Sequence, residues 1–136
     1  MHKIDFVNEV KHALSELTND GIFKIIQIIY DDKNFGNVIV EIGLCENLSI
    51  RFIKDRGDIN CELKKFDEWF WIDDVFEVLG VPSKQSKNNI IDAIINILAQ
   101  IKRNLPSIVK AFNEDNIKDT KSKIKTVATK RVMGTF

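Results

Sequence analysis

Acidic and aromatic residues are interleaved in one short segment of the chain, Asp67-Glu68-Trp69-Phe70-Trp71-Ile72-Asp73-Asp74. Tryptophan supplies the large anchors that dominate protein–protein interfaces, and carboxylates attract a basic partner. A regular element can turn at most two of three consecutive aromatic residues toward the core, so we expect at least one of them to be exposed. The segment therefore predicts a protein-binding patch formed by Asp67, Glu68, Trp69, Trp71, Asp73 and Asp74.

The same segment also has a purely structural interpretation. In that interpretation one aromatic residue closes the core while the acids stay solvated, with Asp67 near the positive N-terminal end of the following helix. The charge of the region is nevertheless uneven, since residues 58–79 contain seven acidic and two basic residues, a net charge of −5. The binding and structural interpretations both stay open at the level of the sequence.

The C-terminal part of the chain carries the opposite charge. Residues 102–136 contain nine basic and three acidic residues, a net charge of +6, so the overall balance of 20 basic and 20 acidic residues hides two segments of opposite sign. Contact with nucleic acid would weaken steeply with added salt. The segment has no interleaved aromatic residues and no recognisable recognition helix, and exposed lysines usually serve solvation. A nucleic-acid-associated regulatory protein is the alternative function, and nucleic acid is not the expected partner.

The residues that catalysis or metal binding would require are sparse. The only histidines are His2 and His12, and the chain contains no His-x-Glu, His-Glu-x-x-His or Cys-x-x-Cys pattern that would hold a metal. None of the six glycines is spaced as a phosphate-binding loop, and there is no Gly-x-Ser-x-Gly nucleophile elbow. We therefore expect no enzymatic activity, no catalytic residue, no metal and no cofactor.

The elements that position these residues follow from the hydrophobic periodicity. Residues 3–18 show the three- and four-residue spacing of an amphipathic helix. The next segments are rich in β-branched and aromatic residues, and several of them alternate apolar and polar positions, which predicts strands at residues 23–30, 38–42, 48–53 and 59–64. Short turns between them, including Asp55-Arg56-Gly57-Asp58, indicate antiparallel neighbours.

Helices return after Phe66 in the predicted order. The first is expected at Ile72–Leu79, where Gly80 and Pro82 end it, and the second from Ile90 to Leu105. Pro106 either kinks this second helix or begins a new one that continues through Phe112. A weaker helical pattern runs from residue 117 to 128. The fold class is therefore α+β, with a four-stranded antiparallel meander preceded by one helix and followed by three or four helices packed on one face. We expect residues 1–136 to form a single domain whose last six residues, Arg131 to Phe136, fray.

Targeting signals are not apparent, which favours the cytoplasm. No apolar segment follows Met1, and the most apolar stretch, residues 90–105, is too short and too often interrupted by polar residues to span a bilayer. Cys45 and Cys61 do not form a disulfide framework and are expected to be reduced. Asn, Ile and Lys are unusually frequent, 12, 21 and 16 of 136 residues, which is typical of an AT-rich coding sequence and suggests a bacterial or phage source.

Three short motifs carry a resemblance to a known group of proteins. They are Phe35-Gly36-Asn37, Ile50-Arg51-Phe52-Ile53-Lys54-Asp55-Arg56-Gly57 and Trp71-Ile72-Asp73-Asp74-Val75-Phe76-Glu77-Val78-Leu79. With them, residues 23–80 resemble small bacterial immunity proteins, which are found near toxin genes and neutralise contact-dependent or polymorphic toxins. The resemblance implies a non-enzymatic cytoplasmic protein that binds one toxin domain, as in contact-dependent growth inhibition. It transfers no binding residues, because immunity proteins vary most where they touch their toxin.

The leading hypothesis combines the patch with this resemblance. An immunity-type inhibitor would occlude a basic toxin active site with the acidic and aromatic residues at positions 67–74. Such an interface would bury about 1,200–2,000 Å² in total. The lysine-rich C-terminal segment departs from the acidic balance of many immunity proteins that neutralise nucleases, so the class of toxin is left open.

Overall fold

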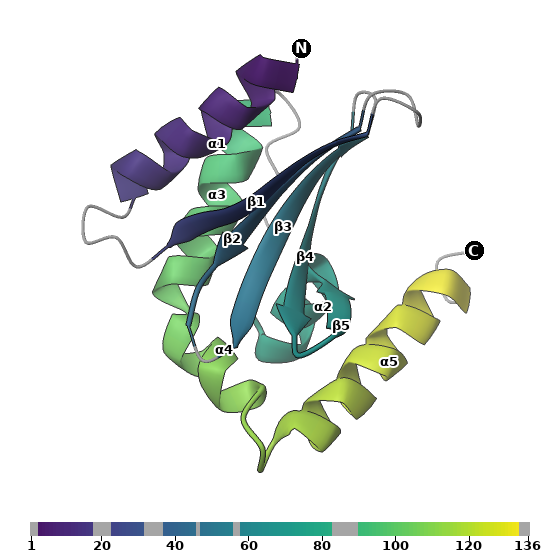
Figure 1. The fold of residues 1–136 in the computed structure, drawn as a ribbon. Coiled ribbons are helices and arrows are strands. Elements are labelled where there is room, and N and C mark those ends of the chain that lie inside the picture. Colours follow the sequence, from purple (N-terminus) through teal and green to yellow (C-terminus); the bar gives the residue numbers. More distant parts are fainter. Residues whose placement is uncertain are drawn as a thin grey trace.

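A five-stranded antiparallel sheet forms the centre of the computed structural model, which describes residues 3–17, 23–31, 37–45, 47–55, 58–82 and 90–133. The strands follow the chain in the order β1-β2-β3-β4-β5, so β1 and β5 are the two edges. Figure 1 shows the sheet with its helices, which makes the fold α+β as expected. The strands are β1 (Lys24–Asp31), β2 (Asn37–Gly43), β3 (Leu48–Asp55), β4 (Asp58–Lys65) and β5 (Glu68–Trp71).

The fifth strand corrects the expected four-stranded meander. Phe66 and Asp67 form a two-residue turn that lets Lys65 pair with Glu68, and the pairing continues to Glu62 opposite Trp71. Residues 68–71 of the acidic and aromatic segment, for which a binding and a structural interpretation were both open, therefore belong to the sheet. This strand is four residues long and runs directly into the helix that begins at Ile72, so no polar break marks it in the sequence.

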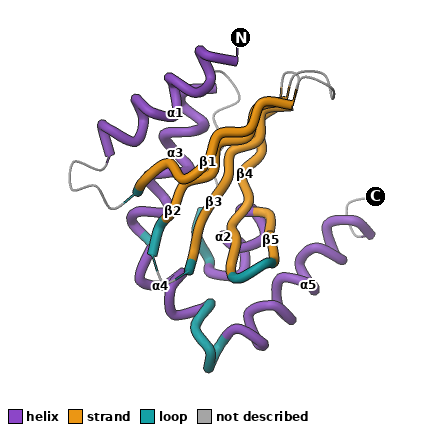
Figure 2. Tube along the Cα trace, in the orientation of Figure 1, coloured by secondary structure: helices purple, strands orange, loops and turns teal. Residues whose placement is uncertain are grey.

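The core lies on one face of the sheet, where α1 (Lys3–Leu17) and α3 (Ile90–Arg103) cover it and residues of the other helices, among them Phe76 and Ile108, complete it. Alternate residues of β2, β3 and β4 point into it because side chains along a strand point to opposite faces. These inward side chains are almost completely buried and include Val38, Val40, Ile42, Ile50, Phe52, Cys61 and Leu63. Figure 2 shows α1 and α3 next to each other against the sheet.

The remaining helices are α2 (Ile72–Leu79), α4 (Leu105–Ala111) and α5 (Ile117–Met133). Helix α2 contacts β4 and β5 and ends at Gly80, whose φ of 70° is the left-handed conformation that glycine adopts most easily. Pro106 lies in the first turn of α4, so it begins a new helix and does not merely kink α3.

Helix α5 departs from the expected single layer of helices. Its strongest packing is against α2, and in Figure 1 it lies beyond β5, at the opposite edge of the sheet from β1. It also runs to Met133, three residues into the segment expected to fray, while residues 134–136 lie outside the described residues. Residues 56–57 of the expected turn Asp55-Arg56-Gly57-Asp58, residues 32–36 and His2 lie outside them as well.

Candidate functional site

Strand β5 distributes its three aromatic side chains over the two faces of the sheet. Phe70 points inward, where its ring centroid lies 5.4 Å from that of the fully buried Phe112. Trp69 and Trp71 point to the opposite face, because neighbouring side chains along a strand alternate. Trp71 is 41% exposed, which confirms that at least one residue of the aromatic run is exposed.

Trp69 is fixed over two cationic side chains of the neighbouring strands. The Arg51 guanidinium lies 3.9 Å from the centroid of the Trp69 ring, and the Lys64 ammonium lies 5.3 Å from it. Arg51 Nε donates to Glu62 Oε1 at 2.6 Å, and Arg51 Nη2 lies 2.5 Å from the same oxygen. A cation held against the face of an indole ring is attracted by the ring quadrupole. The indole is therefore held in place on the surface of the sheet.

These residues belong to the face of the sheet that α1 and α3 do not cover, which we call the open face. Two of its rows cross all five strands, with a register shift between Ile25 and Gln27 of β1, and Ile29 at the β1 edge is also exposed. The rows consist of Gln27, Glu41, Arg51, Glu62 and Trp71, and of Lys24, Gly43, Ser49, Lys64 and Trp69. The face thus combines aromatic rings, aliphatic side chains and charges of both signs.

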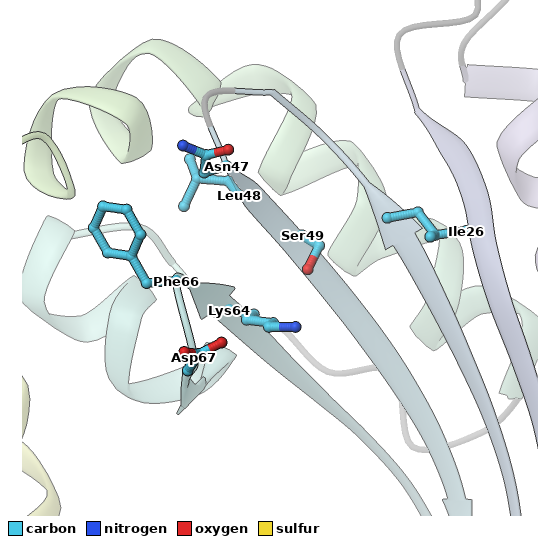
Figure 3. A pocket seen from close by; sticks show the side chains of 7 residues that line it. All are labelled: Ile26, Asn47, Leu48, Ser49, Lys64, Phe66 and Asp67. Atoms are coloured by element: carbon cyan, nitrogen blue, oxygen red, sulfur yellow. The ribbon is translucent and has the colours of Figure 1, made fainter.

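A shallow depression of about 410 Å³ is set into one end of the open face. It is lined by Ile26, Asn47, Leu48, Ser49, Lys64, Phe66 and Asp67, and Figure 3 shows Lys64 on β4, Ser49 on β3 and Ile26 on β1. Gly43 makes room at its edge, because a Cβ there would lie 2.9 Å from Ile26 Cδ1. Ile26 is 60% exposed, so it forms an apolar wall of the depression.

Two residues of this depression have positive φ angles. Asn47 has φ 62° and Phe66 has φ 55°, and they are the non-glycine residues with this conformation in the described part of the chain. Asparagine tolerates the left-handed region, whereas for a bulky residue it is a strained conformation. The Phe66 ring is nevertheless 58% exposed. The turn therefore presents a large apolar side chain to solvent at a backbone cost of roughly 1 kcal/mol.

The acidic residues of the predicted patch have different surroundings. Glu68 Oε1 lies 2.5 Å from Lys121 Nζ on α5, and the buried Asp74 forms an ion pair with Arg131 near the end of the same helix. Asp67 lines the depression and Asp73 is exposed on α2. The structure therefore brings Asp67, Trp69 and Trp71 toward the depression and the open face, and directs Glu68 and Asp74 into contacts within the molecule.

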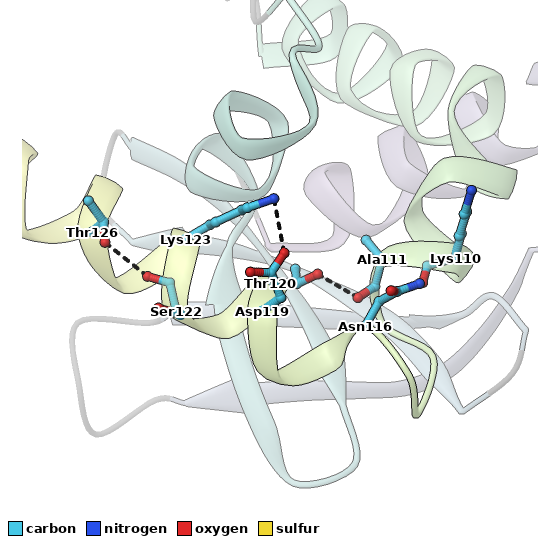
Figure 4. Close-up of polar contacts among 8 residues, drawn as sticks. All are labelled: Lys110, Ala111, Asn116, Asp119, Thr120, Ser122, Lys123 and Thr126. Carbon is cyan, nitrogen blue, oxygen red and sulfur yellow. Dashed lines mark hydrogen bonds and ion pairs between the residues drawn. The ribbon is translucent and has the colours of Figure 1, made fainter.

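Side-chain hydrogen bonds at the start of α5 place its basic residues. The Thr120 hydroxyl donates to the Ala111 carbonyl at 2.6 Å, and the Asn116 amide donates to the Lys110 carbonyl at 3.0 Å (Figure 4). Lys123 pairs with Asp119 on the helix itself at 3.0 Å. Several charges of the basic segment are therefore matched by acidic groups of the same molecule.

Nucleophilic and metal-binding groups are dispersed. The described residues include no group of three or more His, Cys, Asp or Glu side chains that could hold a metal ion. Burial raises the pKa of the Cys61 thiol well above its ordinary value, with further contributions from Asp73 and Glu62. A thiol in such surroundings stays protonated and is a poor nucleophile. In the same part of the chain no helix is long and apolar enough to cross a membrane.

The sequence-based prediction missed five residues of this surface, namely Ile26, Ser49, Arg51, Lys64 and Phe66. A signal for two of them was available, because the alternation of β3 and β4 places Arg51 and Lys64 on the face opposite the buried Phe52 and Leu63. No local pattern in the sequence indicates that the Trp69 ring lies against Arg51 and Lys64, because this contact requires β5 to pair with β4.

Comparison with known proteins finds no matching family model, no matching curated protein and no matching solved structure. The function is therefore argued from the surface itself.

Proposed function

We propose that this chain is a non-enzymatic, cytoplasmic inhibitor of the immunity type, which neutralises a bacterial toxin by covering its active site with the open face. The observation that supports the proposal most is the placement of Trp69 and Trp71 side by side on that face, with Trp69 stacked on Arg51. Tryptophan and arginine are the residues most enriched among those that dominate binding energy.

The rigidity of the surface also favours binding. The residues below Trp69 belong to paired strands, and the Arg51–Glu62 ion pair holds the guanidinium in one orientation before any partner arrives. Immobilising side chains on association costs about 0.5–1.5 kcal/mol for each flexible one. A surface whose large side chains are already held loses less free energy in this way, so more of the contact energy is retained as affinity.

The contacts of the acidic residues narrow the proposed interface. Glu68 and Asp74 already have cationic partners on α5, so they contribute to the fold. The proposed interface therefore centres on Trp69 and Trp71, with Asp67 beside them in the depression and Asp73 at most at the rim. The nucleic-acid alternative has less support, because Lys121 and Arg131 of the basic segment face those same carboxylates.

The test begins with the genes on either side of this one, since the proposal expects one of them to encode a toxin domain, and continues with a calorimetric titration of that domain. We expect Trp69→Ala and Trp71→Ala each to weaken binding at least tenfold, since loss of a central aromatic anchor costs about 2 kcal/mol or more. Val132→Ala is the matched control, because Val132 is 61% exposed but lies on α5. Full affinity in both tryptophan variants, with unchanged circular dichroism, would contradict the proposal.

A further inference from the structure

We infer that the segment of the partner that enters the depression carries a carboxylate next to an apolar side chain. The inference rests on the proposed function, since it specifies the chemistry of a partner that binds the open face. The carboxylate would meet the Lys64 ammonium, and the apolar side chain would pack between Ile26 and Phe66.

Three cations on the sheet and on α5 already have a carboxylate partner. Arg51 is paired with Glu62, Lys121 with Glu68 and Arg131 with Asp74. Lys64 is half-buried, and its ammonium lies 5.3 Å from the centroid of the Trp69 ring. No carboxylate of the described residues lies within ion-pair distance of this ammonium. A cation removed from part of its water and left without a counter-ion attracts an anionic group.

The walls of the depression specify the neighbouring chemistry. Ile26 and Phe66 are 60% and 58% exposed, on two sides of the volume that Lys64 enters. Figure 3 shows them on different segments, with Lys64 and Ser49 between them. The volume of about 410 Å³ accommodates an apolar side chain together with an adjacent carboxylate. Covering both walls would remove apolar surface from water, which favours association.

The sign of this contact is opposite to the sequence-based expectation of a basic partner. Asp67 also lines the depression, and its carboxylate would repel the same acidic segment that Lys64 attracts. Two nearly isosteric substitutions should therefore act in opposite directions. Lys64→Gln removes the attraction, whereas Asp67→Asn removes the repulsion.

The test uses a displayed library of random peptides selected on the full chain, followed by fluorescence anisotropy with the enriched peptides. We expect Asp or Glu beside a large apolar residue in the enriched sequences. Lys64→Gln should weaken their binding about threefold to fivefold and Asp67→Asn should tighten it about twofold, which are the effects of single exposed charges. Added salt should reduce both differences.

Phe66→Gly tests the apolar wall, with Val132→Ala as the control for an exposed apolar residue outside the depression. We expect Phe66→Gly to weaken binding at least fivefold and Val132→Ala to leave it unchanged. Enrichment of basic peptides, a lack of any enriched peptide, or binding that depends on Trp69 but not on Lys64 would overturn the inference. The proposed function is decided separately by the toxin titration, because that experiment depends on the tryptophans and not on Lys64.

Discussion

The contact of α5 with β5 and α2 differs from the depression on the open face in how charges are matched. In the first region, Glu68 meets Lys121 and the buried Asp74 meets Arg131. In the second, the Lys64 ammonium and the Asn47 amide have no polar partner among the described residues. The segments of net charge −5 and +6 therefore neutralise each other where they meet in the fold. Lys64 and Asp67, which both line the depression, have no ion-pair partner among the described residues, so both charges are left for a partner.

The largest expected effect on stability concerns the contact of α5 with β5 and α2, where the charges are paired. Arg131→Ala should lower the free energy of unfolding by about 2 kcal/mol, because it leaves the 3%-exposed Asp74 without its counter-charge. The loss stays below that of a fully buried pair because Arg131 is itself 46% exposed. Urea denaturation measures it. Adding Asp74→Asn to Arg131→Ala should recover part of the loss, and a loss below about 0.5 kcal/mol in the single variant would contradict the assignment.

The two faces of β4 carry different groups, because Cys61 points into the core and Lys64 lies on the open face. The core-facing thiol should make the free energy of unfolding depend on pH. Desolvation raises the pKa of Cys61 in the folded state, so the folded protein holds this proton more strongly than the unfolded chain does. The resulting stability is present below the unfolded thiol pKa of about 8.5 and is lost as pH rises above it, by at most about 1.4 kcal/mol per pH unit.

Urea denaturation between neutral pH and pH values above the thiol pKa measures this effect, with Cys61→Ala as the control. We expect the stability of the Ala variant to fall less steeply with pH than that of the native chain. Native Cys61 should also resist alkylation until the protein unfolds, whereas the half-buried Cys45 reacts in the folded state. Rapid alkylation of Cys61 in the folded protein would show that the thiol is accessible.

A smaller effect is expected at the turn that presents Phe66 to the depression. Phe66→Ala and Phe66→Gly both remove the ring, but only glycine adopts the φ of 55° without strain. The Gly variant should therefore be about 1 kcal/mol more stable than the Ala variant. Both should lose peptide binding equally. Equal stabilities would show that the backbone at this turn is not strained.

The smallest effect is expected at the exposed ion pair between α5 and β5, in contrast to the pair of the buried Asp74. Lys121 and Glu68 are 40% and 56% exposed, so Lys121→Ala should cost at most about 0.5 kcal/mol. Molar salt should remove the difference from the native chain, because exposed charges are screened. A cost as large as that of Arg131→Ala would mean that burial does not distinguish the two contacts.

Local patterns in the sequence predicted much of the fold. The alternation at residues 48–53 and 59–64 identified β3 and β4 to within two residues, and Ile72–Leu79 is the helix that Gly80 was expected to end. β5 was missed because its turn requires a positive φ at Phe66, which a bulky residue disfavours. Without β5 in the predicted sheet, the contact of Trp69 with Arg51 and Lys64 could not be predicted either.

The predicted binding patch was identified in part. The expectation that at least one of the three consecutive aromatic residues is exposed followed from a local property, the periodicity of a regular element, but only the structure showed Trp71 to be 41% exposed. The contacts of Glu68 and Asp74 join residues separated by 53 and 57 positions, so no spacing within the segment could indicate them. The sequence also indicated that the chain frays from Arg131 onward, whereas in the structure Arg131 lies in α5 and forms the ion pair with Asp74.

The sequence by itself determined the α+β class, the strand faces and the presence of an aromatic residue that the core does not cover, because periodicity and side-chain volume act over a few residues. Only the tertiary structure decided which charges remain for a partner. That outcome depends on which distant groups come within a few ångströms, where the Coulomb energy becomes large enough to offset desolvation. The depression beside Lys64 is therefore a property of the folded chain.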